Sequence, residues 1–269
     1  MKKAGLWILA FLLTITAAVY QRMTGPTHAL RGKSVVDSTE ISYKLPRNHE
    51  IGPNCEISVK VPNKDIEGYL LYKRYPTDDP WEKIPMSRQE DLLSANLPQQ
   101  PSSGKLAYRV YLSRQDEGIS LTGDESAIIR FKDYVPRTIL FPHIIVMFLA
   151  MLFSTRAGLE ALDKNGNSRK LVIWTTGLLF VGGMILGPLV QKYAFGSLWT
   201  GFPFGYDLTD NKTLIAMLGW VAALIAGRKG KPARGWVLGA SILLFVVYLI
   251  PHSLLGSQLD YSKLNPPTQ

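Results

Sequence analysis

The chain has 269 residues, a single cysteine, a formal net charge of +9 and a mean hydropathy of +0.06. A surplus of basic residues raises the question of nucleic-acid binding, but segment 21–137 is nearly balanced, with 17 basic and 16 acidic residues. The surplus lies instead in short segments beside apolar runs, which excludes a broad phosphate-binding patch and indicates a lipid bilayer as partner. No nucleic-acid partner is expected. The lone Cys55 excludes an intramolecular disulfide.

Five apolar runs are long enough to cross or nearly cross a bilayer, which takes about 17–25 helical residues. They are residues 4–20, 138–154, 171–190, 214–226 and 236–250. The short segments before the first run, between the second and third runs and between the fourth and fifth runs hold ten basic and two acidic residues. Loops with a basic surplus stay in the cytoplasm. We therefore expect a multi-pass protein of the bacterial inner (plasma) membrane with its N-terminus inside.

Residues 1–20 are expected to form a signal anchor that serves as the first transmembrane helix. Lys2 and Lys3 precede an apolar core at 6–18, whose small residues also offer a cleavage site. Retention is favoured, and cleavage would leave four spans in the same orientation. The polar stretch 21–39 is interpreted as a linker. Residues 21–137, up to the second apolar run, are expected to be extracytoplasmic (periplasmic), as is the C-terminus.

Residues 40–134 alternate between apolar and polar side chains in about seven short stretches, separated by Pro, Gly, Asn, Asp and Ser. The stretches are 41–45, 55–61, 68–75, 81–84, 92–97, 106–112 and 127–131. This pattern is typical of a small antiparallel β-sandwich. Cys55 begins the second stretch and is expected to be a buried thiol, with an intermolecular disulfide as the alternative.

Part of this domain resembles a corner of fibronectin type III and related immunoglobulin-like (Ig-like) modules. Leu97-Pro98 is followed by Gly104 and the stretch 106–112, near whose start lies Tyr108. In those modules a tyrosine at this place hydrogen-bonds back to the preceding corner. The resemblance covers about 40–133 and implies this role for Tyr108. Modules of this kind usually bind proteins or act as spacers.

Residues 135–269 are expected to form a four-helix transmembrane domain. The motif Gly183-x-x-x-Gly187 in its second run allows close helix approach and is interpreted as packing within the bundle. The expected fold class is therefore α+β: a multi-domain membrane protein with a small antiparallel β-sandwich ectodomain and a bundle of four or five transmembrane helices.

The outer connector 191–212 is too polar to span a membrane and unusually rich in aromatic residues and glycine. It is expected either to lie as an aromatic belt at the membrane surface or to cover a site as a lid. Asp210 or Thr209 is expected to cap the following helix, which leaves Asp207 to pair with a lysine or to ligate. The candidate residues of this loop and its surroundings are Lys192, Trp199, Tyr206, Asp207 and Asp210.

Two histidines, His143 and His252, each follow a proline near the outer end of an apolar run. Ionisable residues near membrane spans are often functional, and we expect these two imidazoles to approach each other. His143 also shares a helical stripe with Met147 and Met151, and imidazole with thioether suits copper(I), while imidazole suits haem iron. The sequence thus predicts a metal or haem site at His143, His252 and Met147, with copper or haem b as cofactor. The alternative is that the imidazoles snorkel and the methionines fill an apolar face.

The sequence contains no Walker-type loop, no H-E-x-x-H, no G-x-S-x-G, no C-x-x-C and no C-x-x-C-H. Whether the chain is an enzyme therefore stays open. The first functional hypothesis is an interaction or assembly subunit of a membrane complex, with a protein partner at the outer face. The second is a metal- or haem-binding membrane protein for electron transfer or metal handling. The third is a membrane hydrolase or transferase that uses Asp207, Asp210 and a histidine.

Overall fold

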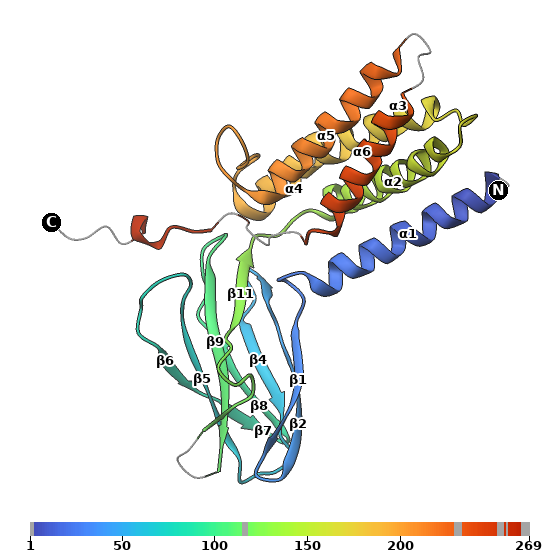
Figure 1. The fold of residues 1–269 in the computed structure, drawn as a ribbon. Coiled ribbons are helices and arrows are strands. Elements are labelled where there is room, and N and C mark those ends of the chain that lie inside the picture. The colour runs from blue at the N-terminus through green and yellow to red at the C-terminus, as the bar shows by residue number, and fades with distance from the viewer. Residues whose placement is uncertain (1–2, 115–117, 229–232, 252–255, 257, 265–269) are drawn as a thin grey trace. The chain divides into compact units, whose positions relative to one another are not determined.

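The computed structural model describes residues 3–114, 118–228, 233–251, 256 and 258–264. The chain divides into two compact units. One, which we call the β unit, comprises 27–134 with 258–269, and the other, the helical unit, comprises 1–26 with 135–257. Figure 1 shows the strands of the first and the helices of the second, so the fold is mixed α+β.

The β unit begins with a hairpin of β1 (Leu30–Val36) and β2 (Thr39–Leu45). Its two-residue turn is made by Asp37 and Ser38, whose φ angles of 48° and 60° are both left-handed. This is the geometry that a tight two-residue hairpin loop requires, and Asp tolerates it better than most residues. The hairpin corrects part of the predicted linker 21–39, because β1 lies inside it and its pairing with β2 satisfies the backbone.

The other strands form two further sheets. The larger sheet has the order β3 (Asn48–Glu50), β11 (Ala127–Lys132), β9 (Lys105–Ser113), β5 (Glu67–Arg74) and β6 (Glu82–Pro85), with β10 (Ile119–Ser120) also paired to β9. The smaller sheet has the order β4 (Cys55–Lys60), β8 (Leu92–Leu97) and β7 (Ser87–Gln89). All pairs are antiparallel except β3 with β11.

Strict alternation produces one apolar core in the β unit. In β4 every second residue is buried, beginning with Cys55, and the same holds for most of β9. Side chains from all three sheets join one cluster, including Ile41, Ile57, Leu70 and Phe131. Cys55 is a free, buried thiol, as predicted, and burial raises its pKa to about 11.

Tyr108 is fully buried, and its hydroxyl donates to the carbonyl oxygen of Pro46 at 2.8 Å. The resemblance to fibronectin type III modules implied a partner in the corner before β9. That partner is wrong: Pro46 follows β2, far from this corner in the sequence. The buried hydroxyl is satisfied instead by the backbone segment between β2 and β3.

The tail of the chain also belongs to the β unit, whereas the sequence placed it in the transmembrane domain. A short 3-10 helix (η3, Tyr261–Lys263) follows the last long helix. The hydroxyl of Tyr261 accepts from the backbone N–H of Lys105 at 3.0 Å, and the guanidinium of Arg74 lies 5.2 Å from the centre of its ring. The backbone N–H of Leu259 donates to Ser103 O at 3.3 Å. These contacts hold the tail against β5, β9 and the segment before β9.

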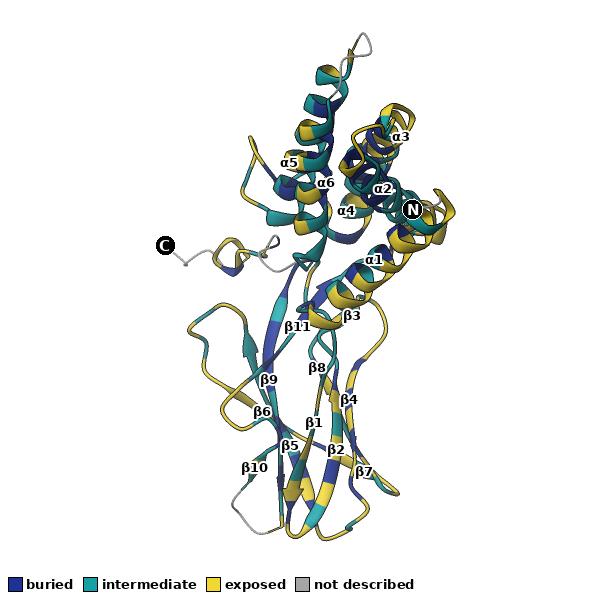
Figure 2. Ribbon diagram, turned by 45° about the vertical axis from the view of Figure 1, so that its right-hand side comes forward, coloured by how far each residue is buried: buried dark blue, intermediate teal, exposed yellow. Residues whose placement is uncertain are grey.

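The helices of the helical unit follow the apolar runs closely. They are α1 (Lys3–Thr24), α2 (Arg137–Leu162), α3 (Arg169–Leu179), a π-helix η1 (Phe180–Leu186), α4 (Gly187–Phe195), α5 (Leu208–Ala226) and α6 (Arg234–Leu249). Among the described helices, four are long and apolar enough to cross a membrane: α1, α2, the continuous stretch from α3 to α4, and α5. The apolar helix α6 has 16 residues and is shorter than these. Much of α1 is exposed (Figure 2), as expected of a helix that faces lipid.

Two glycines in η1 let the helices pack closely. A Cβ on Gly182 would lie 2.8 Å from the sulfur of Met147 in α2, and one on Gly183 would lie 2.7 Å from a methyl carbon of Thr213 in α5. Both distances are too short for a real Cβ, so a side chain at either position would force its neighbour to move. The interpretation of the glycine motif as packing within the bundle therefore holds for Gly183.

The helices alternate in direction, so the unit has two ends. At the basic end, α2 and α5 finish while α3 and α6 start, and Arg234 Nε donates to Ala161 O at 3.0 Å. At the capped end, Gln21 Nε2 donates to Tyr248 O at 2.7 Å and Lys212 Nζ donates to Ile250 O at 2.6 Å. Both donors satisfy carbonyls that α6 leaves unpaired where it finishes.

Candidate functional site

His143 lies in the first half of α2, where it contacts the π-helix. Its Nδ1 is 3.0 Å from Gly182 O, and a carbonyl can only accept, so Nδ1 carries a proton; in the neutral imidazole the lone pair then lies on Nε2. Gly182 O also accepts from the backbone N–H of Gly187, five residues later. The wide turn of the π-helix thus presents one carbonyl to both its own chain and the imidazole, and such turns occur frequently at functional sites.

Met147 fills space beside the same glycine, next to a small cavity of 20 Å³ that Gln21 and Lys212 also line. Met151 is fully buried in the bundle core. These positions are those of methionines that fill a helix interface. Across the described residues, no group of three or more His, Cys, Asp or Glu side chains is placed to hold a metal ion. His252 lies outside the described residues, so its approach to His143 stays a prediction, as do the copper and haem assignments.

The aromatic connector is shorter than predicted and is fixed by acidic side chains. Residues at both edges of 191–212 belong to helices, because α4 continues to a left-handed C-cap at Gly196 and α5 starts directly after Asp207. Asp207, not Asp210, is the N-cap, and its Oδ1 accepts from Thr209 N at 2.8 Å. The sequence had assigned the cap to Asp210 or Thr209.

Asp210 fastens the connector to α5 instead. Its Oδ2 accepts from Thr200 N at 2.6 Å, Thr200 Oγ1 at 3.2 Å and Gly201 N at 3.0 Å. A Cβ at Gly201 would lie 2.6 Å from the Cβ of Asp210, so only glycine allows this approach. The neighbouring Asn211 Oδ1 accepts from Phe202 N at 2.7 Å. Asp210 is buried and its carboxylate serves the loop backbone, which is a structural role.

The other predicted loop residues are spread over its surface. Lys192 is exposed, Trp199 Nε1 donates to Phe202 O at 3.0 Å, and Tyr206 is 93% exposed. Phe202 and Phe204 are also strongly exposed, at 66% and 82%. The connector therefore presents aromatic rings outward, which suits an aromatic belt better than a closed lid.

A second candidate site lies on the β unit and was missed by sequence reasoning. It is a group of interleaved aromatic and basic side chains that we call the aromatic–cation face: Tyr69, Lys73, Trp81, Lys83, Arg109 and Tyr111. The ring of Trp81 lies between Lys73 Nζ, 5.6 Å from its centre, and the guanidinium of Arg109, at 5.2 Å. The strand register could have indicated it, because these positions of β5 and β9 point away from the core.

The rest of the aromatic–cation face continues along the same strands. Tyr69 and Tyr111 are direct cross-strand partners, and their rings stack at 5.1 Å with an angle of 2° between the planes. Lys83 Nζ lies 3.9 Å from the centre of the Tyr69 ring. The stacked rings and cations hold one another in place, so the face is ordered before any partner arrives. Its six residues carry three positive charges and no carboxylate.

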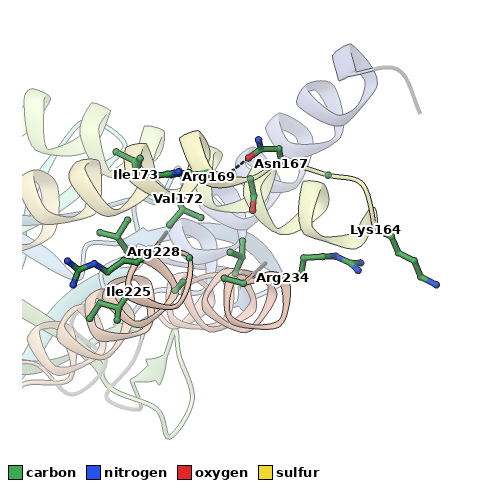
Figure 3. A pocket seen from close by; sticks show the side chains of 15 residues that line it. Lys164, Asn167, Arg169, Val172, Ile173, Ile225, Arg228 and Arg234 are labelled. Atoms are coloured by element: carbon green, nitrogen blue, oxygen red, sulfur yellow. Dashed lines mark hydrogen bonds between the residues drawn. The ribbon is translucent and has the colours of Figure 1, made fainter. Parts of the chain in front are cut away.

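A third site is a cavity at the basic end of the helical unit, lined by loop residues and by α3, α5 and α6 (Figure 3). Sequence reasoning treated its basic residues only as a topology signal.

Comparison with known proteins adds nothing to these three sites: no family model, no curated protein and no solved structure matches the chain.

Proposed function

We propose that the chain is an interaction or assembly subunit of a membrane complex, whose β unit binds an acidic segment of a protein partner through the aromatic–cation face. That face is the observation on which the proposal rests. Trp, Tyr and Arg are the residues that dominate the binding energy of protein interfaces. Here they are partly exposed, preordered by stacking and accompanied by three positive charges, which favours a partner with carboxylates.

The proposal includes a sandwich arrangement for the β unit, of the general Ig-like kind. Its support is the common core: residues of the small sheet, such as Ile57, and of the large sheet, such as Leu70, belong to one apolar cluster. Two sheets that bury one face each against the other leave their outer faces for contacts with partners. The aromatic–cation face is such an outer surface of the large sheet.

We further propose that four helices after the β unit cross the membrane, α6 among them. The chain leaves the β unit at the start of α2 and returns to it after α6, where Tyr261 bonds to Lys105. A membrane cannot lie between parts of one folded unit, so the number of crossings between 134 and 258 must be even. With α2, the α3–α4 stretch and α5 as three spans, α6 supplies the fourth, although 16 residues of helix extend only about 24 Å.

The basic end then faces the cytoplasm by the positive-inside rule, and the β unit and C-terminus lie outside. Reporter fusions test this arrangement: fusions at Asn167 and Gly227 should behave as cytoplasmic, and fusions at Gly196 and Lys263 as external. A fusion at Lys263 that behaves as cytoplasmic, together with an external fusion at Gly196, would show that α6 does not cross the membrane.

The partner is tested by photo-crosslinking in the intact membrane, with a photoreactive residue at position 71, between the two halves of the face, and at Leu92 on the small sheet as the control position. The expected product from position 71 is a crosslink to an Asp- or Glu-rich peptide of another protein. Trp81→Ala or Lys73→Glu should reduce its yield about tenfold or more. Lys60→Glu, the same charge change at an exposed position of β4, should leave it unchanged. Equal yields from all variants would contradict the proposal.

A metal- or haem-binding function remains the second candidate because the π-helix holds the His143 ring through Nδ1, which leaves Nε2 of the neutral imidazole as the nitrogen that could ligate. Elemental analysis and an absorption spectrum of detergent-purified protein test it. A Soret band or stoichiometric copper that is lost in His143→Ala would favour this function. Retention of the same signal in that variant would exclude His143 as a ligand.

A further inference from the structure

The basic end of the helical unit contains a cavity of 710 Å³ between the start of α3, the end of α5 and the start of α6. Figure 3 shows basic side chains from these segments around the apolar Val172 and Ile225. The charged residues that line it are Lys164, Arg169, Arg228 and Arg234, and its described lining includes no aspartate or glutamate. The cavity therefore has an uncompensated positive rim.

The nearby carboxylates are held by other groups. Glu160, in the last turn of α2, has its Oε2 2.7 Å from the guanidinium of Arg156, and its Oε1 accepts at 3.3 Å from the backbone N–H of Asn167, a residue of the cavity lining. The side chain of Asp163 accepts from Asn165 N at 2.9 Å. Arg234 is fixed at the rim because Nε and Nη2 donate to the final carbonyls of α2 at 3.0 and 3.1 Å. Arg234 is thus held in place by the fold, and none of the four basic side chains of the rim forms an ion pair with another described residue.

Below this rim the cavity wall is apolar. It is formed by Val172, Ile173, Ala223, Leu224, Ile225 and Val237. Ile173 and Ile225 are 51% and 58% exposed, so the wall continues onto the outer surface of α3 and α5. A ligand that matches the site has a negative group at one end and a long apolar part that follows the helices.

The backbone supports an anion at the same place. Both α3 and α6 begin at the cavity, and neither of their N-cap residues, Ser168 and Ala233, provides a side-chain cap. At α3 the side chain of Asn167 accepts from the N–H of Arg169 at 3.2 Å, so the N–H groups that remain there are those that follow Arg169. The first N–H groups of a helix lack partners within it, and the helix dipole adds partial positive charge there. Phosphate groups are typical ligands of such helix starts.

We propose that this cavity binds the phosphate headgroup of an anionic lipid, with an acyl chain against Ile173 and Ile225. Phosphate is the shared chemistry of a lipid headgroup and a free phosphate compound, and the apolar wall favours the lipid. Basic pockets between transmembrane helices are known to bind such headgroups. The inference is independent of the proposed partner of the β unit, since the two sites belong to different units.

The test uses the full chain in nanodiscs of zwitterionic phosphatidylcholine, to which phosphatidylglycerol is added, with bound lipid counted by native mass spectrometry and stability followed by thermal unfolding. Arg169→Gln with Arg228→Gln removes two charges from the rim and leaves the structural Arg234 in place. Each lost charge should weaken phosphatidylglycerol binding about fivefold, so the double variant should bind about 25-fold more weakly. The matched control is Lys170→Gln with Arg137→Gln, two exposed basic residues outside the cavity.

Phosphatidylglycerol retained by the wild type and the control pair, and lost by the double variant, supports the proposal. Binding that is equal in all three proteins, or equal for phosphatidylcholine and phosphatidylglycerol, overturns it. A separate arm adds inorganic phosphate without anionic lipid. Phosphate alone could stabilise the wild type as much as phosphatidylglycerol does and compete with it. That result would contradict the proposal that the phosphate group bound in the cavity belongs to a lipid.

Discussion

The two units treat buried charge differently. Of the charged side chains that the structure describes as buried, Arg156, Asp210 and Lys212 belong to the helical unit, and only Arg130 belongs to the β unit. The β unit pairs its backbone between strands, so its core needs few polar side chains. Helices leave carbonyl and N–H groups unpaired at their ends. In the helical unit, charged side chains form hydrogen bonds to some of these end groups and to backbone N–H groups of the adjoining loop.

This difference has an energetic consequence. The attraction within a buried ion pair offsets part of the cost of removing its two charges from water, but removal of one partner leaves the other charge buried without compensation. Neutral hydrogen bonds in a β core are worth less. We therefore expect single polar substitutions to be more damaging in the helical unit than in the β unit.

The largest expected effect is at the Arg156–Glu160 pair, where Arg156 also lies over the ring of Trp7 at 5.5 Å. Glu160→Gln leaves a buried guanidinium without its counter-charge, which costs about 3 kcal/mol. The melting temperature of the detergent-purified protein should fall by roughly 6–12 °C. The double variant Arg156→Met with Glu160→Gln should recover most of this loss, and a double variant as unstable as the single one would show that the charge is not the cause.

The next effect separates the two aspartates of the connector. Asp210→Ala removes the acceptor of three loop donors, among them the buried N–H of Gly201 and the half-buried N–H of Thr200, and the loss of these bonds costs about 2 kcal/mol. Opening of the loop should then make chymotrypsin cleavage after Phe204 or Tyr206 about 30-fold faster. Asp207→Ala removes the helix cap, worth about 1 kcal/mol, and should accelerate cleavage about fivefold. Faster cleavage of Asp207→Ala than of Asp210→Ala would contradict these two assignments.

The predictability of the two units from sequence also differs. All seven predicted strands of the β unit are present, because alternation with period two is a local signal. The linker was misjudged because the turn at Asp37 and Ser38 lacks glycine, although its left-handed φ angles follow from the hairpin it closes. The apolar runs likewise gave the helices, and the main error there was the edges of the aromatic connector.

The sites could be predicted less well because they depend on residues far apart in the chain. The bond from His143 to Gly182 arises only where η1 widens beside α2, and the basic cavity requires the loops after α2 and α5 to meet. In the aromatic–cation face, Lys73 and Arg109 reach Trp81 from different strands. Local patterns supplied the residues in each case, and only the packing decided which of them meet.

In the β unit, a pH-dependent prediction concerns Cys55, whose pKa is raised by burial from 9.0 to about 11. A raised pKa means that the folded state keeps its proton while the unfolded state loses it, so stability is intact below pH 9 and falls as the pH rises towards 11. Relative to Cys55→Ala, the wild type should lose about 2 kcal/mol over this window. Denaturant unfolding at pH 8 and pH 10.5 measures the change, and parallel curves for the two proteins would contradict it.

The smallest expected loss of stability comes from removing a neutral hydrogen bond in the core of the β unit. Tyr108→Phe keeps the buried ring but removes the hydroxyl that donates to Pro46 O at 2.8 Å. The carbonyl then loses one partner in a region closed to water, which costs about 1–2 kcal/mol. Tyr134→Phe, at a ring that is 56% exposed, is the control and should change nothing. Both variants are measured by denaturant unfolding beside Glu160→Gln. If Tyr108→Phe proves more destabilising than Glu160→Gln, the contrast between the units fails, because a neutral bond in the β core would then outweigh a buried ion pair between helical turns.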